Sequence, residues 1–362
     1  MSQFSEGIRF CWMRLAALAV CGLLSLGPST TLAQMPAVRY GAPVSEDVRT
    51  LYDGGLRYIA ASQQNDGSWQ ASYGQGPGMA GLCSLAILSR GEDPNFGAYA
   101  ETLHRALRYI VLRQSRTNGF ISQGGNSHTN MYEHGFATLA LAEAYGAVDE
   151  TLLWAGQGAA RGGKKRGLGK ALELAVQAAI DSQNSNPLGG WRYSPNATDA
   201  DSSVSGAILV SLLAARNAGI RVPEKNIERA LKYYETSTLS DGTVVYTPGM
   251  GGGYSMARSA IGALVFAIAK QKDSPSHRQP LQSLVDRLED EPQQHPYYTR
   301  YYIAQALFHG DVASWTRWNE RTTEVLLASQ REDGAIGHDA YSTSMSLLAL
   351  ALSFRFLPIY ER

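Results

Sequence analysis

A short turn motif recurs along this chain and constrains its fold more than any other feature. It first appears as "QQNDGSW" at 63–69, where an apolar run ends in glutamine, an Asn-Asp-Gly turn follows and a tryptophan closes the segment. Four related segments are "RQSRTNGFI" at 113–121, "SQNSNPLGGWRY" at 182–193, "STLSDGTVVY" at 237–246 and "SQREDGAIG" at 329–337. Recurrence at intervals of tens of residues indicates an array of similar supersecondary units.

The spacing of these turns predicts six units. Their glycines are Gly67, Gly119, Gly190, Gly242 and Gly334, separated by 52, 71, 52 and 92 residues. The 71-residue interval contains the insertion "GQGAARGGKKRGLGK" at 156–170. The 92-residue interval hides a unit whose turn has decayed to "DRLEDEPQQ" at 286–294.

Each turn joins two different kinds of helix. The segments before the turns carry charges beside an apolar stripe at helical spacing, which is typical of a helix with one face in water. Examples are 48–63, 100–115, 225–237 and 319–330. The segments after the turns carry almost no charge on any face and must be buried all round. Examples are 78–89, 134–146, 204–219, 259–270 and 342–354.

A ring of buried helices inside a ring of amphipathic helices satisfies both patterns at once. The sequence therefore predicts an all-α fold, an (α/α)6 toroid of six helix pairs that forms a single domain over residues 45–362. In such a toroid the turn is a corner between the rings. The glutamine amide can satisfy carbonyls left unpaired where the outer helix ends, and Trp69 or Trp191 can cover the joint.

The first 33 residues read as a secretory signal peptide, with Arg9 and Arg14 before a short apolar run and small residues up to Ala33. An uncleaved anchor is the alternative, but the apolar run is short for a bilayer span. We expect cleavage near Ala33, a linker over 34–44, and export to the periplasm or beyond.

The mature chain has a nearly balanced charge and one cysteine. Removal of residues 1–33 leaves 30 basic and 31 acidic residues, so nothing indicates a nucleic-acid partner. Cys83 stands alone in an apolar stretch, which excludes an internal disulfide and predicts a core position.

The turn motifs resemble the QW-type repeats of the terpenoid cyclase and protein prenyltransferase toroids, over roughly 45–362. The order "MYEHGFATLALAEAYG", "GGWRYSPNATDADSSVSG", "PYYTRYYIAQALFHG" and "FRFLPIY" is similar to secreted bacterial prenyltransferase and squalene oxidase repeat proteins. This resemblance implies an α/α toroid that binds an isoprenoid or another apolar ligand in an aromatic central cavity.

The resemblance also bears on catalysis. Cyclases that protonate an alkene use an Asp-x-Asp-Asp motif, and the matching stretch here is "DADSS". Asp199 and Asp201 match its first and second aspartates, Asp201 the proton donor, while Ser202 replaces the last. The competing reading is that Asp201 caps the helix that follows it.

A zinc site of the prenyltransferase kind needs an Asp, a Cys and a His near the mouth of the toroid. The position of Cys83 in an apolar pattern argues against one. The sequence predicts no cofactor and leaves zinc and magnesium open.

One predicted inner helix carries a polar aromatic face made by Tyr298, Tyr301, Tyr302 and Gln305. Such a face most naturally points into the central cavity. Three further residues begin other inner helices and are candidates for the same cavity. His134 is a candidate catalytic group, and Glu133 and Arg258 are candidate binding groups. For each of them, the alternative is a buried polar group that only bridges helix ends.

Three functions remain. The first is an isoprenoid-binding toroid with cyclase-like acid chemistry from Asp201. The second is a polysaccharide lyase or glycosidase that uses Tyr301 or His134 as a base and Arg258 as the neutralising cation. The third is a non-catalytic binding or assembly module, in which these residues only stabilise the core.

Overall fold

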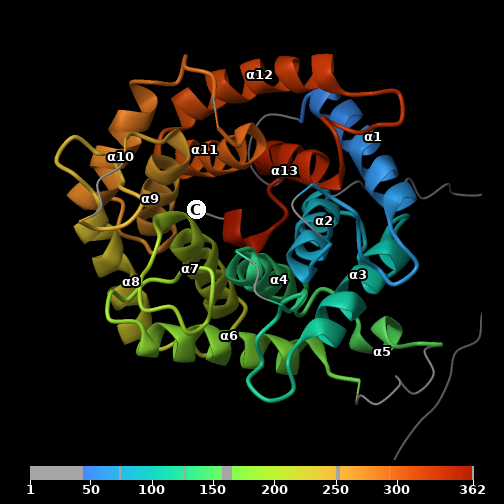
Figure 1. Ribbon diagram of the computed structural model, residues 1–362. Coiled ribbons are helices and arrows are strands. Elements are labelled where there is room, and N and C mark those ends of the chain that lie inside the picture. The colour runs from blue at the N-terminus through green and yellow to red at the C-terminus, as the bar shows by residue number, and fades with distance from the viewer. Residues whose placement is uncertain are drawn as a thin grey trace, which may run out of the picture. The chain divides into compact units, whose positions relative to one another are not determined.

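Two concentric rings of helices make up the fold, as the alternation of amphipathic and wholly apolar segments requires (Figure 1). The structure is a computed structural model that describes residues 44–72, 75–125, 128–156, 165–249, 253–292 and 294–360. The predicted signal peptide and nearly all of the predicted linker lie outside these ranges. Residues from Val44 onward form one compact unit.

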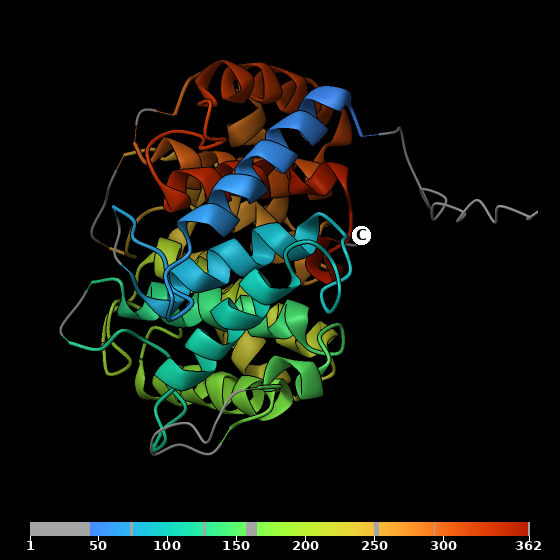
Figure 2. The same cartoon turned by 90° about the vertical axis from the view of Figure 1, so that its right-hand side faces the viewer.

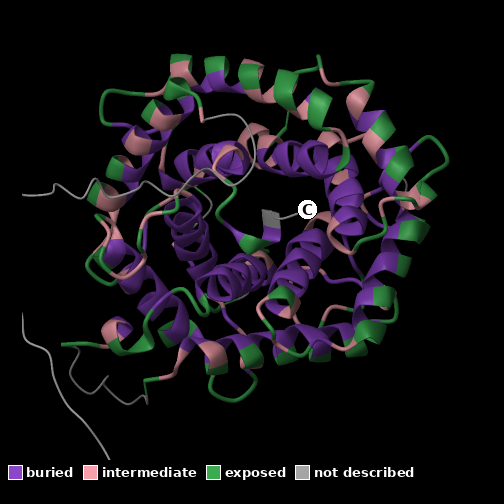
Figure 3. Cartoon of the chain, turned by 180° about the vertical axis from the view of Figure 1, so that it is seen from behind, coloured by how far each residue is buried: buried purple, intermediate pink, exposed green. Residues whose placement is uncertain are grey.

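The outer ring contains the amphipathic helices. They are α1 (Glu46–Ser62), α3 (Ala100–Arg113), α6 (Leu168–Ser185), α8 (Glu224–Ser237), α10 (Pro275–Val285) and α12 (Val312–Ser329). Each buries one face against the inner ring and exposes the other, which Figure 3 shows as alternating colour along each helix. A short helix, α5 (Glu150–Leu153), lies in the long connection between α4 and α6.

The inner ring contains helices that are buried on nearly every side (Figure 3). They are α2 (Pro77–Ser89), α4 (Asn130–Ala144), α7 (Ser202–Asn217), α9 (Met256–Ile268), α11 (Pro296–Gly310) and α13 (Ala340–Leu350). Each contacts the next in chain order, and α13 contacts α2, so the ring closes. The predicted (α/α)6 toroid is therefore confirmed. Cys83 is fully buried in α2, in the core position expected for it.

At four corners the repeated glutamine links an outer helix to the following one. Gln63 Nε2 donates to Gly67 O in its own turn (3.2 Å) and to Thr102 O in α3 (2.9 Å). Gln330 Nε2 does the same with Gly334 O (3.1 Å) and with Leu51 O in α1 (3.0 Å), which joins the last outer helix to the first. Gln114 and Gln183 repeat this pair of bonds at their own corners.

The turn glycine is required at these corners for two physical reasons. Gly67 has φ 92°, and a Cβ there would lie 2.2 Å from Arg105 O. Gly334 has φ 89°, and its Cβ would lie 2.2 Å from Gly54 O. At the α6–α7 corner this role belongs to Gly189, with φ 80°. The repeat spacing had selected Gly190, one residue too late.

The corner tryptophans complete the joints. Trp69 Nε1 donates to Ile59 O (2.8 Å), and Trp191 Nε1 donates to Ala179 O (2.9 Å), so each indole bonds back to the outer helix that precedes it. Both rings are buried. The interpretation of the motif as a structural corner is confirmed.

The two ends of the toroid differ. At one end lie the corners and the N-termini of the inner helices. At the other, the chain after α13 turns into the ring as η1 (Ala351–Ser353) and η2 (Pro358–Tyr360), and η2 packs against α7 (Figure 2). Leu357 and Ile359 are buried there, so the C-terminal segment covers this end of the central axis. Among the described residues, no helix combines the length and apolar character needed to cross a membrane.

Candidate functional site

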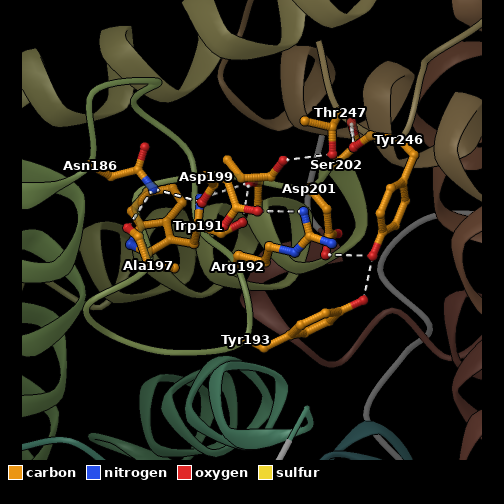
Figure 4. A network of polar contacts seen from close by, with 12 residues as sticks. Asn186, Trp191, Arg192, Tyr193, Ala197, Asp199, Asp201, Ser202, Tyr246 and Thr247 are labelled. Atoms are coloured by element: carbon orange, nitrogen blue, oxygen red, sulfur yellow. Dashed lines mark hydrogen bonds and ion pairs between the residues drawn. The ribbon is translucent and has the colours of Figure 1, made fainter. Parts of the chain in front are cut away.

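Asp201 lies at the centre of the polar network at the corner end of the ring (Figure 4). It caps the N-terminus of α7, where its Oδ1 accepts from Ser203 N and Val204 N, both at 2.8 Å. Its Oδ2 accepts from the Tyr246 hydroxyl at 3.2 Å. The capping role that competed with the catalytic one is therefore real, and it uses only one of the two carboxyl oxygens.

The surroundings of Asp201 are unusual for a helix cap. The residue is 0% exposed, and burial raises the pKa of its carboxyl, although the two backbone N–H groups, the Tyr246 hydroxyl and the nearby Arg192 lower it. The net pKa shift is upward. Two deeply buried phenols, Tyr233 and Tyr234, also lie close enough to interact with it electrostatically.

Tyrosine rings from opposite inner helices meet on the axis beside Asp201. Tyr298 on α11 lies edge-to-face with Tyr132 on α4 (centroids 6.4 Å apart), and its hydroxyl donates to Ser203 O (3.4 Å). Burial, followed by neighbouring phenols and Asp201, raises the pKa of both tyrosines. Both rings remain partly exposed. They form the upper layer of an aromatic centre.

A second aromatic layer lies one helical turn deeper. Tyr301 packs against Phe136 of α4 (6.4 Å) and against Tyr302 (4.7 Å), and burial raises the pKa of Tyr301 to about 12. Tyr301, Tyr302 and Gln305 are each 1% exposed. Rings that lined an open cavity would be accessible to water, so this layer is a packed floor. The expected face does point to the ring centre, but its lower part fills the centre.

His134 does not face the central cavity, as the sequence predicts, but the outer ring. Its Nδ1 accepts from Ile121 N (3.1 Å) and its Nε2 donates to Ala175 O of α6 (3.0 Å), so the ring points outward between α4 and the outer ring. It is fully buried, and burial lowers the pKa of its imidazole to about 4. Both ring nitrogens are occupied by backbone groups, which leaves neither for acid–base chemistry.

Glu133 and Arg258 also hold backbone segments. Glu133 accepts from Gln123 N (2.5 Å) and from the Thr129 hydroxyl (3.1 Å). Arg258 donates to Val244 O (2.9 Å) and to Gly253 O (2.6 Å). Burial raises the pKa of Glu133 and lowers that of Arg258. Of the two, only Arg258 lies close enough to Asp201 to interact with it.

Asp199 lies apart from Asp201, at the surface of the same corner. Its carboxylate forms an ion pair with Arg192 (2.7 Å), and the Arg192 guanidinium stacks over the rings of Tyr193 (5.2 Å) and Tyr246 (5.4 Å). The hydroxyls of Tyr193 and Tyr246 hydrogen-bond to each other.

Sequence reasoning missed Arg192, Tyr193 and Tyr246. The first two stand in "GGWRYSP", directly after a corner tryptophan, and that position was the available signal. Tyr246 closes the "STLSDGTVVY" turn, which was read only as a corner.

No three His, Cys, Asp or Glu side chains of the described residues are grouped closely enough to hold a metal ion. In particular, Cys83 is buried in the core, and burial raises the pKa of its thiol well above the usual value. A site of the zinc-thiolate kind therefore has no geometric support in this part of the chain.

The fold resembles several solved toroids at low sequence identity. Type II terpene cyclase MstE from Scytonema is 15% identical, with a TM-score of 0.55 over 86% of this chain and 100% of that chain. It has also been solved in complex with geranylgeranyl dihydroxybenzoate as substrate. A novel alpha-amylase from Clostridium perfringens is 12% identical (TM-score 0.55, over 87% of this chain and 99% of that chain).

A third similar structure is a possible member of GH105 family from Salmonella enterica, which is 12% identical (TM-score 0.50, 89% and 98% covered). No protein-family model and no curated protein matches the sequence. At these identities the likeness establishes the α/α toroid alone.

Proposed function

We propose that this toroid is an acid-dependent protein of the terpenoid cyclase kind. In this proposal it binds an isoprenoid or a similarly apolar ligand against the upper tyrosine layer, and Asp201 supplies the proton. The single observation that carries the proposal is the position of the Asp201 carboxyl, which is wholly buried beside the tyrosines on the ring axis. Cyclase-like chemistry needs an acid that is shielded from water and has a raised pKa, and burial raises the pKa of Asp201.

The hydrogen bonds of Asp201 bear on which carboxyl oxygen would carry the proton. Oδ1 accepts two backbone N–H groups, and Oδ2 accepts one hydrogen bond, from the Tyr246 hydroxyl. In our proposal the acidic proton is therefore taken up on Oδ2, and the Tyr246 hydroxyl then no longer donates to it. The same N–H groups stabilise the carboxylate that remains after proton transfer. Burial favours the neutral, protonated form of the carboxyl. The N–H groups of the helix N-terminus favour the carboxylate and so assist release of the proton.

The upper tyrosine layer supports the choice of ligand. Tyr132 and Tyr298 present partly accessible rings beside Asp201, and the packed floor of Tyr301 and Tyr302 lies beneath them. Aromatic faces provide dispersion contacts for an apolar chain and attract positive charge through their quadrupoles. They would therefore favour a carbocation over the neutral ligand.

The proposed step balances without a cofactor. The proton on Asp201 Oδ2 forms a bond to one alkene carbon, the π electron pair becomes that C–H bond, and the other carbon becomes cationic. Attack by a further alkene of the ligand closes a ring, and loss of a proton or addition of water ends the reaction. Asp201 then regains a proton from water.

We further propose that this activity lies outside the cytoplasm, a proposal supported by the predicted signal peptide at 1–33 and by the resemblance to exported repeat proteins. The polysaccharide alternative in its original form has less support, because its three residues do not converge. His134 faces the outer ring, Tyr301 lies in the packed floor and Arg258 binds two backbone carbonyls.

The test uses protein purified from its own host and analysed by native mass spectrometry, with lipid extraction. It is then incubated with squalene and with geranylgeraniol as probes. We expect a bound isoprenoid and a cyclised product. Asp201→Asn should retain binding but form no product, because asparagine caps helices as well as aspartate and cannot donate a carboxylic proton.

Tyr298→Ala is the matched binding variant and should lose the bound lipid. Tyr58→Ala, a partly buried ring on α1 in the outer ring, serves as the control and should keep it. Product formation at the wild-type rate by Asp201→Asn would refute the acid role. A protein that retains no apolar molecule and binds neither probe would refute the proposed ligand.

A further inference from the structure

A cleft of about 490 Å³ opens between two neighbouring corners. Its walls are the described parts of the α3–α4 corner (114–125 and 128–130) and the α6–α7 corner (186–199), and we call it the two-corner cleft. We propose that the two-corner cleft binds a short neutral saccharide. The inference goes beyond the proposed acid chemistry and needs neither Asp201 nor an isoprenoid. The side chains used in the argument are Phe120, His128, Arg192, Tyr193 and Asp199.

The charged groups of the cleft come as a pair. Arg192 and Asp199 form an ion pair at 2.7 Å, with 23% and 55% of their side chains exposed, so both reach solvent at the cleft wall. A ligand at this wall meets a donor and an acceptor side by side. Sugar hydroxyls both donate and accept, and adjacent hydroxyls match such a pair. A free anion would gain Arg192 but would face the Asp199 carboxylate.

Aromatic rings flank this pair. Tyr193 lies edge-to-face with His128 from the opposite corner (5.1 Å), and Phe120 lines the same cleft. Rings of this kind offer apolar faces to the C–H side of a sugar, while the polar groups take its hydroxyls. A wholly apolar ligand would instead desolvate Arg192 and Asp199 without giving them new partners, which costs free energy.

The α6–α7 wall is held in place by buried hydrogen bonds. Asn186 is 2% exposed, and its Nδ2 donates to Ala197 O (3.0 Å) and to Asp199 O (2.8 Å), which fixes the backbone that carries Asp199. The Tyr193 hydroxyl is held by Tyr246, and Arg192 stacks over both rings (Figure 4). A pre-organised wall lowers the entropy cost of binding a flexible, weakly apolar ligand.

The volume suits a short oligomer. About 490 Å³ lies within the range of pockets that enclose small-molecule ligands, about 300–1,000 Å³. The cleft is open on one side, so a longer chain could extend into solvent while its terminal units occupy the cleft. The chemistry therefore points to the end of a neutral glycan.

The experiment is a screen of the mature protein against an array of neutral glycans, with α- and β-linked glucans, xylans, galactans, mannans and chitin oligomers. Hits are followed by saturation-transfer NMR and calorimetry. Trigalacturonate and inorganic phosphate are the anionic probes. We expect a neutral trisaccharide to bind with a Kd below about 1 mM, with transfer to its ring C–H protons.

Two variants locate the site. Tyr193→Ala and Asp199→Ala should each weaken binding about tenfold or more, since each removes one wall contact. Phe356→Ala, at an exposed ring near the other end of the toroid, should leave Kd unchanged. Circular dichroism checks that each variant is folded.

Three results would overturn the inference. They are the absence of binding by every neutral glycan on the array, binding restricted to trigalacturonate or phosphate, and an unchanged Kd in Asp199→Ala. None of them bears on whether Asp201 protonates an isoprenoid, so either proposal can fail while the other stands.

Discussion

Two inner helices of this toroid begin with the same device in different surroundings. Asp201 caps α7 and Asp339 caps α13, each after a corner of the repeated kind. Asp339 accepts from Ser342 N (2.9 Å) and Ser72 N (2.7 Å) and is partly exposed. Burial raises its pKa, but the hydrogen bonds outweigh burial, so the net shift is downward. For Asp201 burial prevails and the net shift is upward.

The comparison shows that the repeated corner explains why an aspartate caps each helix. The surroundings of each aspartate determine whether its pKa is raised or lowered. Each aspartate accepts two backbone N–H groups, both from α7 for Asp201 but one from α13 and one from Ser72 for Asp339, so the number of such bonds does not distinguish them. What distinguishes them is cover. Asp201 is 0% exposed and also accepts from the Tyr246 hydroxyl, whereas Asp339 is partly exposed.

The largest expected effect is the pH dependence of stability caused by His134, which must be known before the two aspartates are compared at acidic pH. The pKa of His134 is lowered from 6.5 to about 4 by burial. Between these two pH values the imidazole is protonated in the unfolded chain but neutral in the folded chain. The stability from this residue is present above pH 6.5 and is lost as pH falls towards 4. The loss is about 3 kcal/mol. Urea unfolding at neutral and acidic pH measures it, and His134→Gln should reduce the difference by most of that amount. An unchanged pH dependence would mean that His134 is protonated in the fold.

Removal of the Asp339 cap should cost more than removal of the Asp201 cap. Asp339→Ala deletes two hydrogen bonds to a carboxylate, and we expect a loss of about 2 kcal/mol in the free energy of unfolding at neutral pH. Chemical denaturation measures this loss. Ser342→Ala, which removes only the reciprocal half of the capping box, is the milder control. A loss below that of the control would show that Asp339 is not the working cap.

Asp201→Ala should cost only about 1 kcal/mol, because the lost cap is partly offset by relief from burying a carboxyl. Asp201→Asn keeps both N–H contacts and should lie within about 0.5 kcal/mol of the wild type. The same denaturation series gives both values. If Asp201→Asn were as destabilised as Asp201→Ala, the carboxyl would be needed in its charged form. That result would contradict the proposed difference between Asp201 and Asp339.

The smallest effects should have opposite signs. Asp201 binds its proton more tightly in the folded state, so its contribution is full below the unfolded pKa, near 3.8, and is lost as pH rises through the folded pKa. Asp339 contributes above that value and loses its contribution as pH falls. Stability differences between wild type and each Asp→Asn variant, followed across acidic pH, isolate the two slopes. Slopes of the same sign would contradict the account.

The fold could be predicted from the sequence because its signals are local and repeated. Charge on one face of a helix predicts a place in the outer ring, and absence of charge predicts a place in the inner ring. The Gln and Gly of the repeated motif predict the corners between the rings. The one-residue error at Gly190 arose because spacing alone cannot tell which of two adjacent glycines carries the positive φ.

The site could be predicted only in part. Periodicity placed Tyr298, Tyr301 and Tyr302 on one face of α11, but it carries no information on what the opposite helix presents. Phe136 and Tyr132 of α4 decide how full the centre is. His134 and Arg258 bind backbone carbonyls outside their own helices, and such partners cannot be identified from residue type. The Arg192–Asp199 pair is closed by a corner loop whose path the sequence does not specify.

The most direct test of the central claim is a pH titration by NMR of protein labelled with 13C at the aspartate carboxyl carbons. Asp201→Asn and Asp339→Asn serve to assign the two resonances. The account predicts that the Asp201 resonance titrates above the ordinary range of aspartate and the Asp339 resonance below it. If the Asp201 resonance instead titrates at or below the ordinary value, Asp201 is an ionised cap like Asp339, and the toroid has no acid at its centre.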